Sequence, residues 1–476
     1  MSIEALLTSF EWNTESARAL RRAEMVTAEA CAFQKANHSP LADLDFELRG
    51  EMGRSIGEVV DEACVALSSC GYPSRHPGAF AHMVPPPATI SIIGDFLKAS
   101  FNQCAFTVEQ APLAPALERA VLDWIKATLN LPSESAGLVT SGGTISNLTA
   151  AFLARERGKR LAPDARRCAI FTDQSHFSVR KALRLLDIPV DAHFVIETEG
   201  DGSFTRTSFV ETVRRSERAG YRPFLLVCTA GTTNAGLIEP IGDFSDLARR
   251  TGAWLHIDGA HGAYIALTHR LDPGYWAVAD SVSWDPHKTL FATYPAGALL
   301  IRDPAEKAVL EQAAEYAFQN GAVEHPAKAH LEGSRGLEAL KVWMTIRHFG
   351  RAGFALLAEH LTSAAATLAE LIDAHSEFVL LSAPQTNIVC FRWTGSRGAD
   401  LDRVNSAAQQ AMYDEGEYLL SQTRLGGHVA LRAVIQNPVT DHSHLKGMLE
   451  RLAEIAIEIA HPAPYRSGYT SGVATC

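Results

Sequence analysis

The sequence has few of the features that mark disulfide-rich, metal-binding or membrane-spanning proteins. Its eight cysteines are scattered, without a CxxC pair or dense spacing, so neither a disulfide scaffold nor a metal site is expected. No apolar run reaches the roughly 20 residues that a bilayer crossing needs. The first residues, MSIEALLTSFEWNTE, lack the basic start and apolar stretch of a secretory signal. We therefore expect a cytoplasmic protein with reduced thiols.

The sequence also has fewer basic than acidic residues. Lysine and arginine number 43 against 54 acidic residues, which gives a net charge of -11. This balance opposes nonspecific attraction to nucleic acid or to an anionic membrane. The expected partner is therefore a small molecule, with no nucleic acid and no membrane involved.

The 476 residues divide into four regions by their residue patterns. Apolar residues at helical spacing over 14–70 predict an N-terminal helical segment, 1–75. Residues 76–350 are predicted to form a large α/β domain that ends with a helix over 335–349, closed by Gly350. Residues 351–460 are predicted to form a small α+β domain, and 461–476 a mobile tail of low apolar content.

Short apolar strands recur in the large domain, separated by helical or loop sequence. They are CAIFT (168–172), FLLVCT (224–229), WLHID (254–258), DSVSW (280–284) and GALLI (297–301). This alternation predicts a mainly parallel sheet with helices on both faces. In the small domain, NIVCFRW (387–393) and a hairpin turning at Gly426 and Gly427 predict an antiparallel sheet.

Three polar motifs follow predicted strands, where open α/β sheets bind their ligands. TSGGTISN (140–147) is a glycine turn that opens a helix, which suits a phosphate group, although many such turns are only structural. Asp258 ends a buried strand and could hold the charged ring nitrogen of pyridoxal phosphate, or simply cap a turn. Lys288 follows another strand in apolar surroundings, where a lysine can form a Schiff base, although an isolated loop lysine is usually solvated. Their order within one α/β region favours the functional interpretation.

Several further motifs, in the same order, resemble those of the group II pyridoxal-phosphate-dependent amino acid decarboxylases. This family includes the glutamate, cysteine sulfinate and aromatic amino acid enzymes, and the resemblance spans about residues 70–450. The motifs on which the resemblance rests are FTVEQAP (106–112), SGGTISNL (141–148), DQSH (173–176), TAGTT (229–233), HIDGAHG (256–262), DPHK (285–288) and NP (437–438). HPGAFAHMVPPPA (76–88) is similar to bacterial members.

The resemblance implies a role for each matching residue. Lys288, His176 and Asp258 would be catalytic: the Schiff-base lysine, the ring stacked on the cofactor and the partner of its ring nitrogen. The implied cofactor-binding set also contains Gly142, Gly143, Thr144, Ser283 and His287 at the phosphate, Ala260 on the second ring face, and Thr229 near the substrate carboxylate. The implied substrate set is Phe80, His82, Met83, Phe106, Thr107 and the carboxylate-binding Arg432. Alternatives are a core role for His176, a strand-end role for Thr229 and an interdomain ion pair for Arg432.

The resemblance also implies a fold and a reaction. The fold is the type I fold of pyridoxal-phosphate enzymes, with a mainly parallel seven-stranded sheet, a small C-terminal α+β domain and a homodimer whose active sites lie at the subunit interface. The reaction is decarboxylation of an L-amino acid, through an external aldimine and a quinonoid, with release of CO2 to give an amine.

Some positions depart from the family pattern. Residues 318–333 contain no tyrosine, where decarboxylases often carry one that helps to protonate the quinonoid. Tyr316 lies just before this stretch, and His325 and His330 are the candidate proton donors, unless they are solvated loop residues.

The missing tyrosine leaves other functions open. The alternatives are an oxygen-dependent aldehyde synthase, a carbon–carbon lyase, or a non-catalytic scaffold that binds pyridoxal phosphate. Asp285 and Thr289 replace a frequent asparagine and tryptophan. A pocket with His82 and Met83 fits neither a purely acidic nor a purely aromatic substrate side chain.

Overall fold

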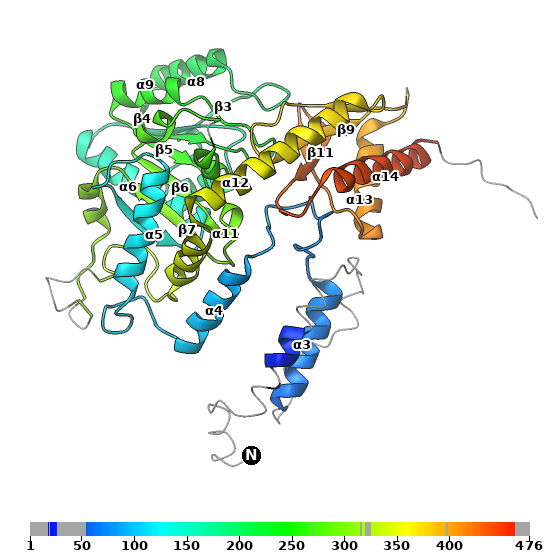
Figure 1. Ribbon diagram of the computed structural model, residues 1–476. Helices are drawn as coiled ribbons and strands as arrows, with labels where there is room; N and C mark the ends of the chain where they lie inside the picture. Colours follow the sequence, from blue (N-terminus) through cyan, green and yellow to red (C-terminus); the bar gives the residue numbers. More distant parts are fainter. Residues whose placement is uncertain are drawn as a thin grey trace, which may run out of the picture.

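The computed structural model describes residues 18, 20–25, 54–268, 270–314, 317–318, 325–396 and 398–461. Two domains lie side by side, and the long helix α12 (Glu338–Ala374) runs along both of them (Figure 1). The larger domain is built on a seven-stranded sheet and the smaller on a four-stranded sheet.

The large sheet has the strand order β1-β7-β6-β5-β4-β2-β3. Its strands are β1 (Ala136–Thr140), β2 (Arg167–Thr172), β3 (His193–Ile196), β4 (Arg222–Thr229), β5 (Trp254–Asp258), β6 (Ser281–Trp284) and β7 (Gly297–Ile301). Strands β6, β5, β4, β2 and β3 are parallel to one another, whereas β7 is antiparallel to both β1 and β6. The predicted mainly parallel, seven-stranded sheet is therefore confirmed.

Alternate residues of the central strands enter two separate cores, one on each face of the sheet. Ile170, Leu226 and Ile257 pack with residues of α5, α8, α9 and α12. Phe171 and Val227 belong to the second core, with residues of α6 and α7. Both faces are covered, which explains why these strands have continuous apolar sequences. The helices of this domain are α4 (Thr89–Phe101), α5 (Ala114–Thr128), α6 (Gly143–Leu161), α7 (Phe177–Leu185), α8 (Arg206–Arg218), α9 (Ile241–Thr251), α10 (Gly274–Ala277) and α11 (Pro286–Thr289), with 3-10 helices η3 (Val190–Ala192), η4 (Gly262–Leu267) and η5 (Pro304–Leu310).

Helix α12 is interrupted at Gly350, whose φ of 62° lies in the left-handed region. The predicted helix over 335–349 thus breaks at the expected glycine, but it begins at Glu338, and helical structure resumes as far as Ala374. Within the described chain, α12 is the one helix long and apolar enough to cross a bilayer. Its apolar side chains enter the cores of both domains, among them Ile346 in the large domain and Leu368 in the small one.

The small domain has the antiparallel strand order β10-β11-β9-β8. Its elements are β8 (Phe378–Leu380), β9 (Ile388–Trp393), α13 (Leu401–Glu415), β10 (Ser421–Leu425), β11 (His428–Val434) and α14 (His442–Ala460). The predicted hairpin is present, and Gly426 and Gly427 both have positive φ, as a tight two-residue turn requires.

Residues 79–80 belong with the small domain, although the sequence places them in the large one. Ala79 forms an isolated parallel bridge with Leu419, and Val434 donates its N–H to the carbonyl oxygen of Phe80. The backbone of this short segment thus satisfies its hydrogen bonds against the small domain, a long-range pairing that has no local sequence signal.

Helix α3 (Ile56–Cys70) projects away from both domains (Figure 1). A capping box of Ser55 and Glu58 begins it, as expected for a helix start. The rest of the predicted helical segment, apart from residues 18 and 20–25, lies outside the described residues, as does the predicted tail beyond residue 461.

Candidate active site

A pocket of about 280 Å³ lies at the carboxyl ends of strands β4, β5 and β6. Thr229, Asp258 and Ser283 are register partners on these adjacent parallel strands, so their side chains meet at one edge of the sheet. Nine of the ten predicted cofactor-binding residues line the pocket: Gly142, Gly143, Thr144, His176, Thr229, Asp258, Ala260, His287 and Lys288. The tenth, Ser283, donates a hydrogen bond to Asp258. Residues more than 140 positions apart in the sequence are thus brought together.

The glycine turn between β1 and α6 forms one wall of the pocket. A Cβ atom on Gly142 would lie 3.0 Å from Cε1 of His287, and one on Gly143 would lie 2.9 Å from Cβ of Ala260. Gly142 also has a φ of 149°. Only glycine fits this close approach. The first N–H groups of α6 have no acceptor within the helix, so this end of the pocket suits a phosphate group.

Asp258 lies at the end of β5 and accepts hydrogen bonds from three donors. Its Oδ2 accepts from Nδ2 of Asn147 at 2.7 Å, and its Oδ1 accepts from the N–H of Ala260 and the hydroxyl of Ser283, both at 3.2 Å. Burial alone would raise the pKa of this carboxyl group, but nearby His256 and the amide of Asn147 bring it below its usual value. The carboxyl group of Asp258 is therefore ionised and can bind a positively charged group.

His176 caps the N-terminus of α7 and lines the pocket. Its Nδ1 lies 2.8 Å from the hydroxyl oxygen of Ser178 and accepts the N–H of the same residue. Burial lowers the pKa of His176, so the ring is neutral, and its proton must then sit on Nε2. His176 is thus a pocket residue rather than an isolated core histidine.

Lys288 lies in the short helix α11, and its Nζ is 3.0 Å from Oδ2 of Asp285. The same oxygen lies 3.5 Å from Nε2 of His287, whose Nδ1 accepts the N–H of Ala296. Burial lowers the pKa of His287 to about 4, so this ring is neutral and carries its proton on Nε2. Asp285, which departs from the family pattern, is therefore the group that holds the lysine amine in the pocket.

Glu239 is a buried carboxyl group that the sequence reasoning missed. It accepts hydrogen bonds from the hydroxyl of Thr172 and, at 2.7 Å, from the backbone N–H of Thr229. It therefore ties the end of β2 to the end of β4 behind the pocket. Burial raises the pKa of Glu239 to about 7. The only sequence signal was an acidic residue in the apolar stretch GLIEPI.

Glu239 should make stability depend on pH. The folded pKa of about 7 lies above the ordinary glutamate pKa of 4.5, so the folded state binds the proton more tightly. Its contribution is complete below the unfolded pKa and is lost as the pH rises through about 7, up to a total of roughly 3 kcal/mol. Glu239→Gln should therefore gain stability relative to the wild type between about pH 5 and about pH 8, measured by urea unfolding. A constant difference across this range would contradict the assignment.

None of the six predicted substrate residues lines the pocket within one chain. Phe80 is 1% exposed and packs in the core of the small domain, so it is a core residue and the prediction is corrected. Phe106 stacks on Phe318 at 5.5 Å, and Thr107 beside it is buried. The ring of His82 lies 5.6 Å from that of Tyr72.

Arg432 adjoins the pocket from the small domain. Its guanidinium donates to the carbonyl oxygens of Thr233 and Ala81 at 2.6 and 3.2 Å, and to the hydroxyl of Ser421 at 2.9 Å. Thr233 itself lines the pocket. Among the residues that the structure describes, no carboxylate forms an ion pair with Arg432, so an interdomain ion pair is not its role. A buried cation without an acidic partner suits an incoming carboxylate.

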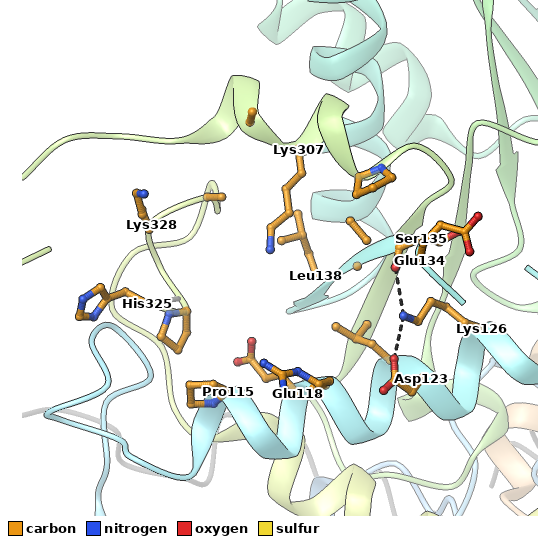
Figure 2. Close-up of a pocket in the computed structure, with 18 of the residues that line it drawn as sticks. Pro115, Glu118, Asp123, Lys126, Glu134, Ser135, Leu138, Lys307, His325 and Lys328 are labelled. Carbon is orange, nitrogen blue, oxygen red and sulfur yellow. Dashed lines mark hydrogen bonds and ion pairs between the residues drawn. The ribbon is translucent and has the colours of Figure 1, made fainter. Parts of the chain in front are cut away.

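The two candidate proton donors lie elsewhere. His330 donates through Nε2 to the carbonyl oxygen of Val139 at 2.9 Å and accepts the N–H of Glu332 at Nδ1, so both nitrogens are occupied and the prediction for it is corrected. His325 lines a separate cavity of about 780 Å³ between α5, η5 and residues 325–329 (Figure 2). This cavity also contains side chains of both charges, such as Lys126 and Glu118, and is not the pocket of Lys288.

The pocket residues fit pyridoxal phosphate. The glycine turn leaves room for a phosphate, Asp258 offers an anion for the ring nitrogen, and Lys288 offers an amine for the aldehyde. The buried hydroxyl oxygen of Thr229 has no hydrogen-bond partner within the described chain, although Thr229 lines the pocket. Buried polar atoms are normally paired, so this hydroxyl is suited to a bound molecule.

Residues 54–394 match the sequence model of a family described as "Pyridoxal-dependent decarboxylase conserved domain". The chain belongs to this family. This decarboxylase is 31% identical to L-2,4-diaminobutyrate decarboxylase of Rhizobium meliloti over 94% of each chain. It is 28% identical to aromatic-L-amino-acid decarboxylase of Bacillus atrophaeus, over 82% of this chain and 83% of the relative. It is also 28% identical to cysteine sulfinic acid decarboxylase of Rattus norvegicus, over 95% and 97%.

Solved structures agree with this assignment. The glutamate decarboxylase domain of a Vibrio parahaemolyticus diaminobutyrate enzyme has a TM-score of 0.84 and 25% identity, covering 94% of this chain and 96% of that one. Mouse CSAD has a TM-score of 0.85 and 23% identity, covering 94% and 99%. The predicted type I fold, the pyridoxal phosphate cofactor and the carboxy-lyase activity on amino acids are therefore confirmed.

Proposed function

We propose that the pocket at the ends of β4, β5 and β6 is where this enzyme binds pyridoxal phosphate and decarboxylates an L-amino acid. Lys288 would hold the aldehyde carbon, Asp258 the ring nitrogen and His176 one ring face, with Ala260 on the other. Gly142, Gly143, Thr144, Ser283 and His287 would bind the phosphate. The observation that carries the proposal is the convergence of Asp258, His176 and Lys288 in one pocket of about 280 Å³.

The pocket residues supply binding, orientation and charge. Bound pyridoxal phosphate supplies an electron sink for the bond that breaks at the substrate Cα. Asp258 would balance a positive charge on the ring nitrogen, because three hydrogen-bond donors stabilise its buried carboxylate. Asp285 keeps the amine of Lys288 at the pocket wall, where it can accept or donate a proton. Arg432 would orient the substrate carboxylate with the donors that its protein contacts leave free.

Arg432→Lys should separate substrate binding from cofactor binding. Lysine keeps the positive charge but not the planar fork, so we expect kcat/KM to fall by about 10–100-fold, mainly through KM. The affinity for pyridoxal phosphate should stay within about threefold of the wild type, because Arg432 does not line the cofactor pocket. Steady-state kinetics and a cofactor titration measure the two effects. An unchanged KM would remove Arg432 from the substrate site.

We further propose a small L-amino acid with a polar side chain, L-2,4-diaminobutyrate first, as the substrate. The 31% identity to L-2,4-diaminobutyrate decarboxylase, over 94% of both chains, supports this choice. The test is kcat/KM for a panel that includes L-2,4-diaminobutyrate, cysteine sulfinate, glutamate and the aromatic amino acids. A preference of at least about tenfold for L-2,4-diaminobutyrate is expected, and a preference for an aromatic substrate would overturn the choice.

The second candidate function is oxygen-dependent aldehyde synthesis. The absence of tyrosine from residues 318–333 favours it, and so does the position of His330, whose two ring nitrogens bind the backbone. The same panel decides, because an aldehyde synthase would release aldehyde, ammonia and peroxide instead of an amine.

We also propose a homodimer. Helix α3 projects from the body of the chain (Figure 1), and its Val59, Val65 and Leu67 are 51%, 59% and 72% exposed. Phe96 and Phe101 on α4 are 44% and 72% exposed. A second copy would cover these apolar side chains and could bring Phe106 and Thr107 to the partner's pocket. Sedimentation should give twice the chain mass of 51.5 kDa, and a monomer at micromolar concentration would contradict the proposal.

A cytoplasmic location is part of the same proposal. Cys64, Cys104, Cys168, Cys228 and Cys390 are all free thiols. Free, partly buried cysteines are typical of proteins from reducing compartments. The net charge of -11 supports a protein that binds neither nucleic acid nor an anionic membrane.

A further inference from the structure

We propose that Asn147 is a positioning residue whose side-chain amide stabilises the charged form of Asp258 and links it, through the hydroxyl of Ser178, to His176. The inference rests on the proposed cofactor site, because it assigns a task to a residue that supports that site. Asn147 is 3% exposed, lies in the second turn of α6 and lines the pocket.

The amide of Asn147 contacts three polar side chains from two different elements, β5 and α7. Its Nδ2 lies 2.7 Å from Oδ2 of Asp258 at the end of β5 and 2.9 Å from the hydroxyl oxygen of Ser178 in α7. Its Oδ1 lies 3.0 Å from Nε2 of His256 in β5. Both amide hydrogens and the carbonyl oxygen therefore have partners.

The carboxylate of Asp258 fixes the direction of these hydrogen bonds. An ionised carboxylate can only accept, so the NH2 group of Asn147 must face it and the carbonyl oxygen must face His256. Nε2 of His256 then has to carry a proton. Burial lowers the pKa of His256 to about 4, so the ring is neutral and Nδ1 is an acceptor.

The same chain of donors continues into the core behind the pocket. Nδ1 of His256 lies 2.8 Å from the hydroxyl oxygen of Ser281, which must donate to it. Ser281 in turn accepts from the indole N–H of Trp254 at 2.8 Å, a group that can only donate. The hydrogen bonds that lead from Trp254 through Ser281, His256 and Asn147 to Asp258 therefore all have the same donor-to-acceptor direction. Flipping the amide of Asn147 would break its hydrogen bonds to both His256 and Asp258.

On the other side, the network reaches His176, whose Nδ1 already accepts the backbone N–H of Ser178. The second hydrogen of the Asn147 amide occupies a lone pair of Ser178, which leaves the hydroxyl hydrogen of Ser178 free to donate to Nδ1 of His176. The proton of His176 must then be on Nε2. The residue proposed to face the ring and the residue proposed to face its nitrogen are thus coupled through Asn147, in surroundings where a mismatched polar group is costly.

Asn147→Asp tests this coupling, because it keeps the shape of the side chain and removes the donor. When the new carboxyl group is protonated, it can still donate to Asp258; when it ionises, two carboxylates 2.7 Å apart repel. We expect kcat and the affinity for pyridoxal phosphate to approach wild-type values near about pH 6. Both should fall at least tenfold relative to the wild type by about pH 8.5, with a parallel change in the absorbance of the bound cofactor.

Asn405→Asp is the matched control. Asn405 is also fully buried, and its side chain binds the backbone of Trp393 and Leu401 in the small domain. This variant should lose stability without the pH-dependent loss of cofactor affinity. Equal, pH-independent losses in the two variants would show that Asn147 is only structural, and would overturn the proposal.

A second pair of variants, at His256, tests the same network if Asn147→Asp fails to fold. His256→Gln still offers an N–H to the carbonyl of Asn147, whereas His256→Leu does not. We expect the glutamine variant to stay within about threefold of the wild type in cofactor affinity and the leucine variant to lose at least tenfold. Equal effects would contradict the directional network. If Asp258→Asn leaves cofactor affinity unchanged, the proposed site itself fails; if only the Asn147 and His256 variants behave as wild type, the coupling alone fails.

Discussion

Lys288→Ala is expected to abolish the visible absorption band of the bound cofactor and to lower kcat by at least about 10³-fold. Lys288 is the one lysine that lines the pocket in the described part of the chain, and Asp285 holds its amine at 3.0 Å. Without this amine, no side chain there can bind an aldehyde covalently. Absorbance spectra and steady-state rates, with the cofactor in excess, measure the two effects.

Lys126→Ala is the control for this prediction. Lys126 is 8% exposed and lies 2.7 Å from Asp123, but it lines the larger cavity rather than the pocket. Its loss should lower stability and leave the absorption band in place. A normal band in Lys288→Ala would mean that another amine holds the cofactor and would refute the proposed site.

Asp258→Asn should be the second most damaging change, lowering kcat by roughly 10²–10³-fold. Asparagine has the same shape but cannot balance a positive ring nitrogen, and a buried cation without its partner costs about 3–5 kcal/mol. The new amide would also face Nδ2 of Asn147, which is a donor. Both effects act on the electron sink, so the loss should appear in kcat more than in KM.

Asp280→Asn provides the comparison for Asp258. Asp280 is a largely buried carboxylate that accepts hydrogen bonds from Arg157 and from the N–H of Leu255, but it does not line the pocket. The Asp280→Asn variant should have a lower free energy of unfolding than the wild type and an unchanged kcat. A similar loss of kcat in both variants would contradict a chemical role for Asp258.

The sequence predicted the centre of the fold well, because buried parallel strands have a strong local signal. All five predicted strand runs of the large sheet occur within one or two residues of their expected positions. Strands β1 and β3 were not predicted; they have only five and four residues, and His193 begins β3. Their place in the sheet depends on pairing with β7 and β2, which has no local pattern.

The candidate site was predictable where a residue directly follows a strand or glycine turn. Asp258, Lys288 and His176 could be named from the sequence for this reason and from the family resemblance. Phe80 and His330 were misjudged, because only the fold decides whether a loop side chain turns to the pocket or to the core. Asn147 and Glu239 were not recognised, because their importance comes from partners about 110 and 67 residues away in the sequence.

The most direct test of the account is the balance of products from an amino acid labelled in its carboxyl group. The labelled substrate would be incubated with the holoenzyme and with Lys288→Ala, and CO2, amine, aldehyde and peroxide would be measured together. We predict equal amounts of CO2 and amine from the wild type, without peroxide, and neither product above background from the variant. Labelled CO2 with aldehyde and peroxide would point to the oxygen-dependent reaction, and no CO2 from any L-amino acid would contradict the proposed function of the pocket.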